Sequence, residues 1–309
     1  MHSSTTATAA HATGARVWLE MDQQALDDAY DQAVWAPNRE ILLKRRRTAS
    51  EQALARLGPP RRLAYGPSAI EQLDIYTTRQ PQAPIHLFIH GGAWRGGLAR
   101  EAAFMAEMFL SAGAHFVVPD FAWVQDVDGR LMTLAEQVRR AVAWVYTNAA
   151  SFGGDPQRLY LSGHSSGAHL GGVVLVTDWP GQYGLPPDLL RGAVLISGMY
   201  DLAPVRLSKR SQYVRFDDAS EAALSTQRHL AALRTPLVLA YGTEESPEFQ
   251  RQSREFAAAV QAAGKPVELL VGTGYNHFEI QETLGNPFGL GGRAVLQQMQ
   301  LAPFSRACV

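Results

Sequence analysis

The sequence predicts an α/β protein with a mostly parallel central sheet and helices on both faces. Strand-like and helix-like segments alternate along most of the chain, and this alternation is typical of parallel sheets. Residues 85–89 form a nearly continuous apolar run, as expected for a strand buried on both faces. With 309 residues, the chain is long enough to bury a substantial core in one domain.

The N-terminal part precedes this alternation. We interpret residues 1–15, which are rich in Ser, Thr and Ala, as a flexible tail, and residues 16–309 as a single domain. Residues 22–57 look helical, with Leu26, Tyr30 and Val34 at helical spacing. The sequence leaves open whether this helical segment covers an active site.

A run of four basic residues, 44–47, lies inside the helical segment. Such a run can bind an anionic partner. Apolar residues precede it and Glu51 follows, so we interpret it as a solvated helix face.

The alternation assigns each element to a range. Strands are expected at 62–65, 72–76, 85–89, 115–118, 158–162, 192–196, 236–241 and 267–271. Helices are expected at 101–112, 131–150 and 247–263 and directly after residue 167. Ligands of parallel sheets bind at the carboxyl ends of the strands, so the polar residues just after each strand are the candidates for a site.

Composition limits the partners. The formal net charge is −1 and the isoelectric point is near 6.8, which gives no reason to expect nucleic acid or a membrane surface as a partner. The single cysteine, Cys308, cannot form a disulfide within the chain, and this fits a cytoplasmic protein. No apolar run has the length of a membrane span, and no cluster of His, Asp and Glu has the spacing of a metal site.

Residues 163–167, with the sequence Gly-His-Ser-Ser-Gly, are the most informative motif. They fit the pattern G-x-S-x-G at a point where a short strand passes into a helix. A sharp turn of this kind exposes the serine hydroxyl and brings the next backbone N–H close to the reacting carbonyl. Ser165 is therefore the candidate nucleophile.

A glycine pair in residues 90–94, His-Gly-Gly-Ala-Trp, follows the expected strand at 85–89. Backbone N–H groups in such a turn can bind a developing oxyanion, and a few donors in a dry site lower the barrier by several kcal/mol. We expect the donors to be the N–H groups of Gly92, Ala93 and Ser166.

His277 is the candidate general base. It lies a few residues after the last expected strand, where the base of such a nucleophile is found. The two histidines that flank the nucleophile, His164 and His169, lie too close to it along the backbone to face its hydroxyl. His90 is expected to anchor the glycine turn, and His86 to pack in the sheet.

An orienting carboxylate is expected after the strand at 236–241, where Glu244 and Glu245 are adjacent. Ser246 is a suitable N-cap for the following helix, which puts Glu245 beside a helix N-terminus that favours its ionised form. We prefer Glu245 and keep Glu244 as the alternative. Asp201 is expected to cap a helix.

The order of these features is glycine-rich turn, serine, acid and histidine, which is the order found in α/β-hydrolases. The chain further resembles the arylformamidase (kynurenine formamidase) family over roughly residues 85–284. The motifs that carry this resemblance are HGGAWR at 90–95, AFM at 103–105, GHSSGAHL at 163–170, TDW at 177–179, SGMYDLAP at 197–204, SPEFQRQS at 246–253 and HFEI at 277–280.

The resemblance implies an α/β-hydrolase fold with the nucleophile at Ser165 and the base at His277. Three positions depart from the family pattern. Glu245 stands where the acid is usually Asp, Ala93 where Tyr is frequent, and Ser166 where Ala is usual. The last two positions leave open whether N-formylkynurenine is the substrate.

These features predict a serine hydrolase, without cofactor or metal, that cleaves a small aryl formamide resembling N-formylkynurenine, or an ester, through an acyl-enzyme. A carboxylesterase or amidase for another small aryl substrate is the alternative, because a triad does not determine its substrate. A non-catalytic ligand-binding protein with this fold is a remote alternative, since such proteins typically lose a triad residue.

Four aromatic residues near expected strand ends predict a wall for an aryl substrate. They are Trp94, Trp123, Tyr275 and Phe278. Core packing would suit Trp123 and Phe278 equally well.

Overall fold

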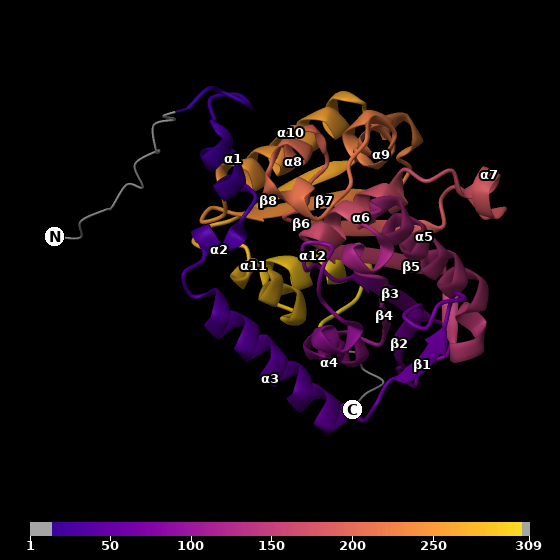
Figure 1. The fold of residues 1–309 in the computed structure, drawn as a ribbon. Coiled ribbons are helices and arrows are strands. Elements are labelled where there is room, and N and C mark those ends of the chain that lie inside the picture. Colours follow the sequence, from indigo (N-terminus) through magenta and orange to yellow (C-terminus); the bar gives the residue numbers. More distant parts are fainter. Residues whose placement is uncertain (1–13, 305–309) are drawn as a thin grey trace.

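The computed structural model describes residues 14–304, which fold around one eight-stranded sheet (Figure 1). The strand order is β1-β2-β4-β3-β5-β6-β7-β8. β2 pairs antiparallel with β1 and β4, and all other neighbours are parallel. The strands are β1 (Arg61–Ala64), β2 (Gln72–Tyr76), β3 (Ala83–Ile89), β4 (His115–Pro119), β5 (Gly154–His164), β6 (Leu190–Ile196), β7 (Leu237–Gly242) and β8 (Val267–Gly272). The prediction of a mostly parallel sheet is confirmed.

Helices cover both faces of this sheet (Figure 1). The α-helices are α1 (Gln23–Ala29), α2 (Gln32–Trp35), α3 (Arg39–Leu57), α4 (Ala106–Ser111), α5 (Leu131–Asn148), α6 (Ser166–Leu175), α7 (Trp179–Tyr183), α8 (Ala203–Leu207), α9 (Asp218–Leu224), α10 (Pro247–Ala262), α11 (Glu279–Glu282) and α12 (Leu290–Gln298). Short 3-10 helices lie at Ala99–Met105, Val124–Val127, Ala149–Phe152, Lys209–Gln212, Thr226–Ala232 and Thr283–Gly285. Among the described residues, no helix combines the length and apolar character that crossing a bilayer requires.

The two faces bury separate apolar cores because successive side chains of a strand point in opposite directions. On β3, Ile85, Leu87 and Ile89 join the core under α5, α6 and α10. Phe88 joins the core under α4 and α12. Both faces of β3 are therefore dry, which explains its continuous apolar run.

Most expected elements are present, with shifted ends. Leu134, Val138 and Val142 of α5 are fully buried, as their spacing predicts. β5 begins four residues earlier than expected, at Gly154. Residues 99–105 form a 3-10 helix that passes into α4, where one α-helix was expected.

The prediction of one amphipathic helix over residues 22–57 is wrong. Asp22 and Asp31 each accept a hydrogen bond at a helix start, so the segment divides into α1, α2 and α3. The break removes the helical register on which the spacing argument depended. Leu26 and Tyr30 are buried, whereas Val34 is 54% exposed.

The boundaries of the expected tail and domain stay predictions. Residues 1–13 and 305–309, the latter including Cys308, lie outside the described residues.

Gly167 lies at the start of α6, where this helix passes over the end of β3. A Cβ at this position would lie 2.1 Å from the carbonyl oxygen of Ile89 and 2.5 Å from that of His90. Both atoms belong to the backbone and cannot move aside cheaply. The sheet therefore admits only glycine at this crossing.

We expect Gly167→Ala to lower the free energy of unfolding by about 3 kcal/mol, the upper end of the usual cost of overpacking. Urea denaturation measures this change. Gly96→Ala is the matched control, because a Cβ there meets its nearest atom at 3.7 Å. Equal stability of the two variants would contradict the steric argument.

Candidate active site

Ser165 lies on a strained turn between β5 and α6. Its backbone has φ 57° and ψ −125°, a conformation that L-residues rarely adopt. The flanking glycines permit the turn: a Cβ on Gly163 would lie 2.6 Å from the carbonyl oxygen of Gly167. The Ser165 N–H donates to the carbonyl of Ile196 at 2.9 Å, which fixes the turn to the end of β6.

Ser165, His277 and Glu245 are hydrogen-bonded in series. Nε2 of His277 lies 2.8 Å from Oγ of Ser165, and its Nδ1 lies 2.6 Å from Oε2 of Glu245. An ionised carboxylate only accepts hydrogen bonds, so Nδ1 carries the proton and Nε2 is free to accept from the serine. This arrangement can activate a hydroxyl as a nucleophile.

Glu245 is 1% exposed and is held by donors from two neighbouring strands. Its Oε1 accepts from the Ser197 hydroxyl at 2.6 Å and from the Gly242 N–H at 2.7 Å. Burial raises the pKa of Glu245 to about 7, and these two donors oppose that shift by stabilising the charged form. Glu244 is exposed, and its backbone N–H donates to the carbonyl of Tyr275. The structure thus brings Glu245, rather than Glu244, to His277.

His277 is 3% exposed, and burial lowers its pKa well below the usual value for histidine. The positive charges of Arg210 and Arg46 act in the same direction. A lowered pKa keeps the imidazole neutral, which is the form that can accept a proton.

His164 lies beside the base and fixes its backbone. Its Nε2–H donates to the carbonyl oxygen of His277 at 2.8 Å, and the two ring centroids are 4.6 Å apart. Phe249 and Phe278 meet the His277 ring edge to face at 4.9 Å and 5.5 Å. The imidazole is therefore held on several sides before any ligand binds.

The glycine turn after β3 has three successive residues with positive φ. The values are 128° for Gly92, 55° for Ala93 and 63° for Trp94. A Cβ on Gly92 would lie 2.1 Å from the Gly96 carbonyl oxygen, so this position requires glycine. Within the described residues, the N–H groups of Gly92 and Ala93 have no acceptor, and the N–H of Ser166, at the first position of α6, has none within that helix.

Ser166 and His169 brace this turn from α6. The Ser166 hydroxyl accepts from the Trp94 N–H at 3.2 Å, and Nδ1 of His169 accepts from the Trp94 indole N–H at 3.2 Å. Burial lowers the pKa of His169 to about 4, which keeps it neutral and able to accept. The serine at position 166 thus gives the turn a hydrogen bond that alanine could not give.

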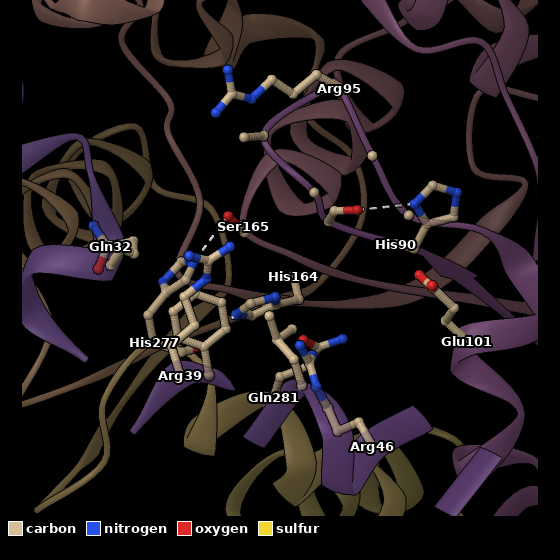
Figure 2. A pocket seen from close by; sticks show the side chains of 18 of the residues that line it. Gln32, Arg39, Arg46, His90, Arg95, Glu101, His164, Ser165, His277 and Gln281 are labelled. Carbon is tan, nitrogen blue, oxygen red and sulfur yellow. Dashed lines mark hydrogen bonds between the residues drawn. The ribbon is translucent and has the colours of Figure 1, made fainter. Parts of the chain in front are cut away.

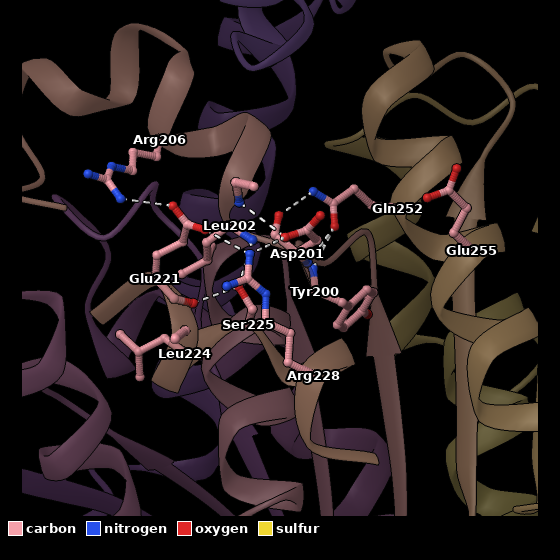
Figure 3. Close-up of polar contacts among 12 residues, drawn as sticks. Tyr200, Asp201, Leu202, Arg206, Glu221, Leu224, Ser225, Arg228, Gln252 and Glu255 are labelled. Atoms are coloured by element: carbon pink, nitrogen blue, oxygen red, sulfur yellow. Dashed lines mark hydrogen bonds and ion pairs between the residues drawn. The ribbon is translucent and has the colours of Figure 1, made fainter. Parts of the chain in front are cut away.

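A separate polar network holds the loop after β6 (Figure 3). Gln252 accepts from the N–H groups of Tyr200 and Asp201 at 2.7 Å and 2.9 Å. Asp201 accepts from the N–H of Ala203 at 3.1 Å, the first residue of α8, and pairs with Arg228. Asp201 therefore bonds the first residue of α8 from the position before the N-cap, which is Leu202.

A cavity of about 720 Å³ opens onto Ser165, His164 and His277 (Figure 2). Residues from the glycine turn, the 209–213 region, the 277–281 region and the N-terminal helices line it. The cavity is large enough for a small aryl compound.

Only one of the four expected wall aromatics lines this cavity. Phe278 does, beside His277. The prediction is wrong for Trp94, which is 1% exposed and packs against His169, and for Trp123, whose indole N–H donates to the Gly97 carbonyl at 3.0 Å. It is also wrong for Tyr275, whose side chain is 36% exposed outside the cavity.

The N-terminal segment forms one wall of the cavity, through residues of α2 and α3 and the residues that precede α2. Arg39, Leu43 and Arg46 of α3 line it, and their spacing of four and three residues puts them on one helix face. The interpretation of residues 44–47 as a solvated face is therefore wrong for Arg46. The spacing was visible in the sequence, but nothing there indicated what this face meets.

No group of three or more His, Cys, Asp or Glu residues that could hold a metal ion is present between residues 14 and 304.

Comparisons with known proteins identify relatives of this chain. The chain is 30% identical to the kynurenine formamidase of Danio rerio over 86% of its length and 93% of that protein. The kynurenine formamidase of Salmo salar is also 30% identical, with the same coverage. The chain belongs to the kynurenine formamidase family. It is a hydrolase.

Family models and a solved structure support the same fold. The model described as BD-FAE matches residues 73–179, and that of the Carboxylesterase family matches residues 132–231. A crystal structure of a candidate thioesterase from Silicibacter sp. superposes with a TM-score of 0.73 at 22% identity, over 85% of this chain and 95% of that one. The α/β-hydrolase fold of the family is thereby confirmed.

We expect Glu245→Gln to lower kcat by about a thousandfold, because an amide cannot hold the imidazole in the required tautomer or stabilise its protonated form. Steady-state hydrolysis of an aryl ester measures this loss. Glu244→Gln is the matched control and leaves kcat nearly unchanged, since this side chain is exposed. The reverse order of the two variants would assign the acid to Glu244.

We expect Ser197→Ala to move the acid limb of the kcat/KM profile to higher pH. The lost hydroxyl stabilised the ionised form of Glu245, so the pKa of that carboxyl rises further above its usual value. The triad needs the ionised form, so activity is lost at a higher pH as the pH falls. Ser253→Ala, a buried serine whose hydroxyl donates to the Phe249 carbonyl, leaves the limb in place; an unmoved limb in Ser197→Ala would contradict the role of this donor.

Proposed function

We propose that this protein hydrolyses a small aryl formamide, with N-formylkynurenine as the reference compound, through an acyl-enzyme on Ser165. The observation that carries the proposal is the continuous hydrogen-bonded series from Ser165 through His277 to the buried Glu245. The family membership directs it toward formamides.

In the first half of the reaction, His277 takes the proton of the Ser165 hydroxyl as its oxygen attacks the formyl carbon. The charge on the carbonyl oxygen is received by the N–H groups of Gly92, Ala93 and Ser166. Glu245 stabilises the imidazolium that forms. His277 then protonates the leaving aryl amine, which leaves a formyl ester on Ser165.

In the second half, water attacks the formyl ester by the same route. His277 takes a proton from the water and returns it to Ser165, and formate leaves. The strained turn at Ser165 and the preset positive φ values at Gly92 and Ala93 hold the nucleophile and the donors in place before the substrate arrives.

Hydrolysis of an aryl ester is the second candidate, because the match to the Carboxylesterase family model covers residues 132–231, including Ser165. The same groups would act, with an alcohol in place of the amine as leaving group. The cytoplasm remains the expected compartment, since Cys308 is the only cysteine of the sequence.

We expect Ser165→Ala to abolish hydrolysis of both N-formylkynurenine and p-nitrophenyl acetate while the circular dichroism spectrum stays unchanged. For the unaltered protein, we expect a higher kcat/KM for the formamide than for a panel of short aryl esters and amides. A strong preference for an ester would overturn the formamidase proposal and leave the mechanism standing. Turnover by folded Ser165→Ala would contradict the nucleophile itself.

A further inference from the structure

We propose that Arg46 forms a carboxylate-binding subsite in the catalytic cavity, which would select substrates by the carboxylate that N-formylkynurenine carries on its aryl side. This inference rests on the proposed function in one respect, namely that the substrate occupies the cavity at Ser165. Arg46 extends from α3 into that cavity, on the side of His164 and Gln281 (Figure 2).

The guanidinium of Arg46 is poorly solvated and has no counterion. Its Nε is buried and without a hydrogen-bond partner, and no described residue forms an ion pair with it. Desolvation lowers its pKa, because the charged form loses contact with water. An unpaired charge in such surroundings is costly, and proteins normally pair it.

The two acids with the strongest electrostatic effect on Arg46 are already engaged. Glu282 forms an ion pair with Arg45, and Glu101 accepts from the Leu98 N–H at 3.2 Å. Neither acid therefore pairs with Arg46, whose side chain lines the cavity.

The wider lining of the cavity is also cationic. Its charged residues comprise six cations, Arg39, Arg46, Arg47, Arg95, Lys209 and Arg210, and two acids, Asp31 and Glu101. Asp31 is paired with Lys209 at 2.6 Å. This excess of positive charge attracts an anionic substrate and repels a substrate whose only charge is positive.

Arg46 is a better candidate for direct contact than Arg210, which is buried and whose Nε also lacks a hydrogen-bond partner. Arg210 donates to the Tyr30 carbonyl at 3.0 Å and to the Tyr213 hydroxyl at 3.3 Å, and it lies over the Trp94 ring. Those contacts give Arg210 a structural role. Arg46 makes no such bonds, so its function is not explained by the fold.

The anion we assign is a carboxylate on the leaving group. The two terminal Nη donors of a guanidinium match the two oxygens of a carboxylate. In a formamide the acyl part is only a formyl group, so any further substituent must lie on the aryl side. Arg46 and His277 line the same cavity, which puts the subsite near the reacting atoms.

The test compares matched substrates that differ only in charge. Aryl acetates, and formanilides, carry either a propionate or the isosteric propionamide on the ring, and kcat/KM is measured for each at pH 8. We expect the unaltered protein to prefer the carboxylate. Arg46→Met lowers kcat/KM for the carboxylate about ten- to hundredfold, the usual effect of losing hydrogen bonds to a charged group. It does not lower kcat/KM for the carboxamide, which carries no charge for the guanidinium to pair.

Two further variants make the result specific. Arg46→Lys keeps the charge without the planar edge and gives an intermediate preference. Lys44→Met removes one positive charge from an exposed position of the same helix that does not line the cavity, and it leaves the preference unchanged. Equal losses for both substrates in Arg46→Met, or an unaltered preference, would overturn the subsite.

A binding measurement on a protein that cannot turn over substrate tests the subsite independently of the proposed function. Calorimetry on the Ser165→Ala protein compares 3-phenylpropionate with 3-phenylpropionamide, with and without Arg46→Met. Loss of the carboxylate preference in the double variant supports the subsite even where formanilides are not cleaved. Equal binding of the two probes to Ser165→Ala contradicts the subsite whatever the enzyme hydrolyses.

Discussion

The buried carboxylate of Glu245 constrains the whole of the candidate site. A carboxylate that is 1% exposed must be hydrogen-bonded to remain charged, because an isolated charge in the interior costs several kcal/mol. Its three partners are the Ser197 hydroxyl, the Gly242 N–H and Nδ1 of His277. They come from the carboxyl ends of β6, β7 and β8, three adjacent parallel strands. The topology of the sheet thus makes it possible to keep this acid both charged and dry.

The strained turns of the site are continuations of the sheet. Ser165 and Ser197 follow neighbouring strands, and both have positive φ, 57° and 56°. The Ser165 N–H donates to the Ile196 carbonyl at 2.9 Å, and the Ser197 N–H donates to the Ala240 carbonyl at 2.8 Å. Each strained residue therefore donates its backbone N–H to the carboxyl-terminal part of the next strand. Because the sheet fixes both conformations, the candidate nucleophile Ser165 and Ser197, which donates to Glu245, are held rigidly relative to each other.

Hydrophobic periodicity and turn-forming residues were sufficient to predict those elements of the fold that depend on local sequence. The apolar run of β3, the buried face of α5 and the strand-to-helix turn at Ser165 could each be predicted, because neighbours along the chain determine them. The preference for Glu245 over Glu244 followed from a helix start at Ser246, and the Ser246 side chain does cap α10. Local reasoning therefore pointed to the glutamate that lies beside His277.

Long-range contacts account for what was missed. Trp94 follows a strand end, which is where a residue of the cavity wall is expected. Its indole N–H instead donates to His169, 75 residues away in the sequence, and the side chain therefore points into the core. Arg46 has the sequence surroundings of a solvated residue, and only the placement of α3 beside the cavity gives it another role. Surroundings that are so distant in the sequence leave no periodic signal. No pattern in the chain could therefore have shown that Trp94 is buried or that Arg46 lines the cavity.

The N-terminal helices and the catalytic sheet are electrostatically linked. Burial lowers the pKa of His277, and the charges of Arg210 and Arg46 lower it further, whereas the Glu245 carboxylate opposes this shift by stabilising the imidazolium. An anion held at Arg46 cancels part of that positive field and makes proton uptake by His277 more favourable. A carboxylate-bearing substrate would thus strengthen the base that activates Ser165, whereas a neutral substrate would leave the field of Arg46 unopposed. If Arg46 binds the substrate carboxylate as proposed, selection by charge acts on the chemical step as well as on binding.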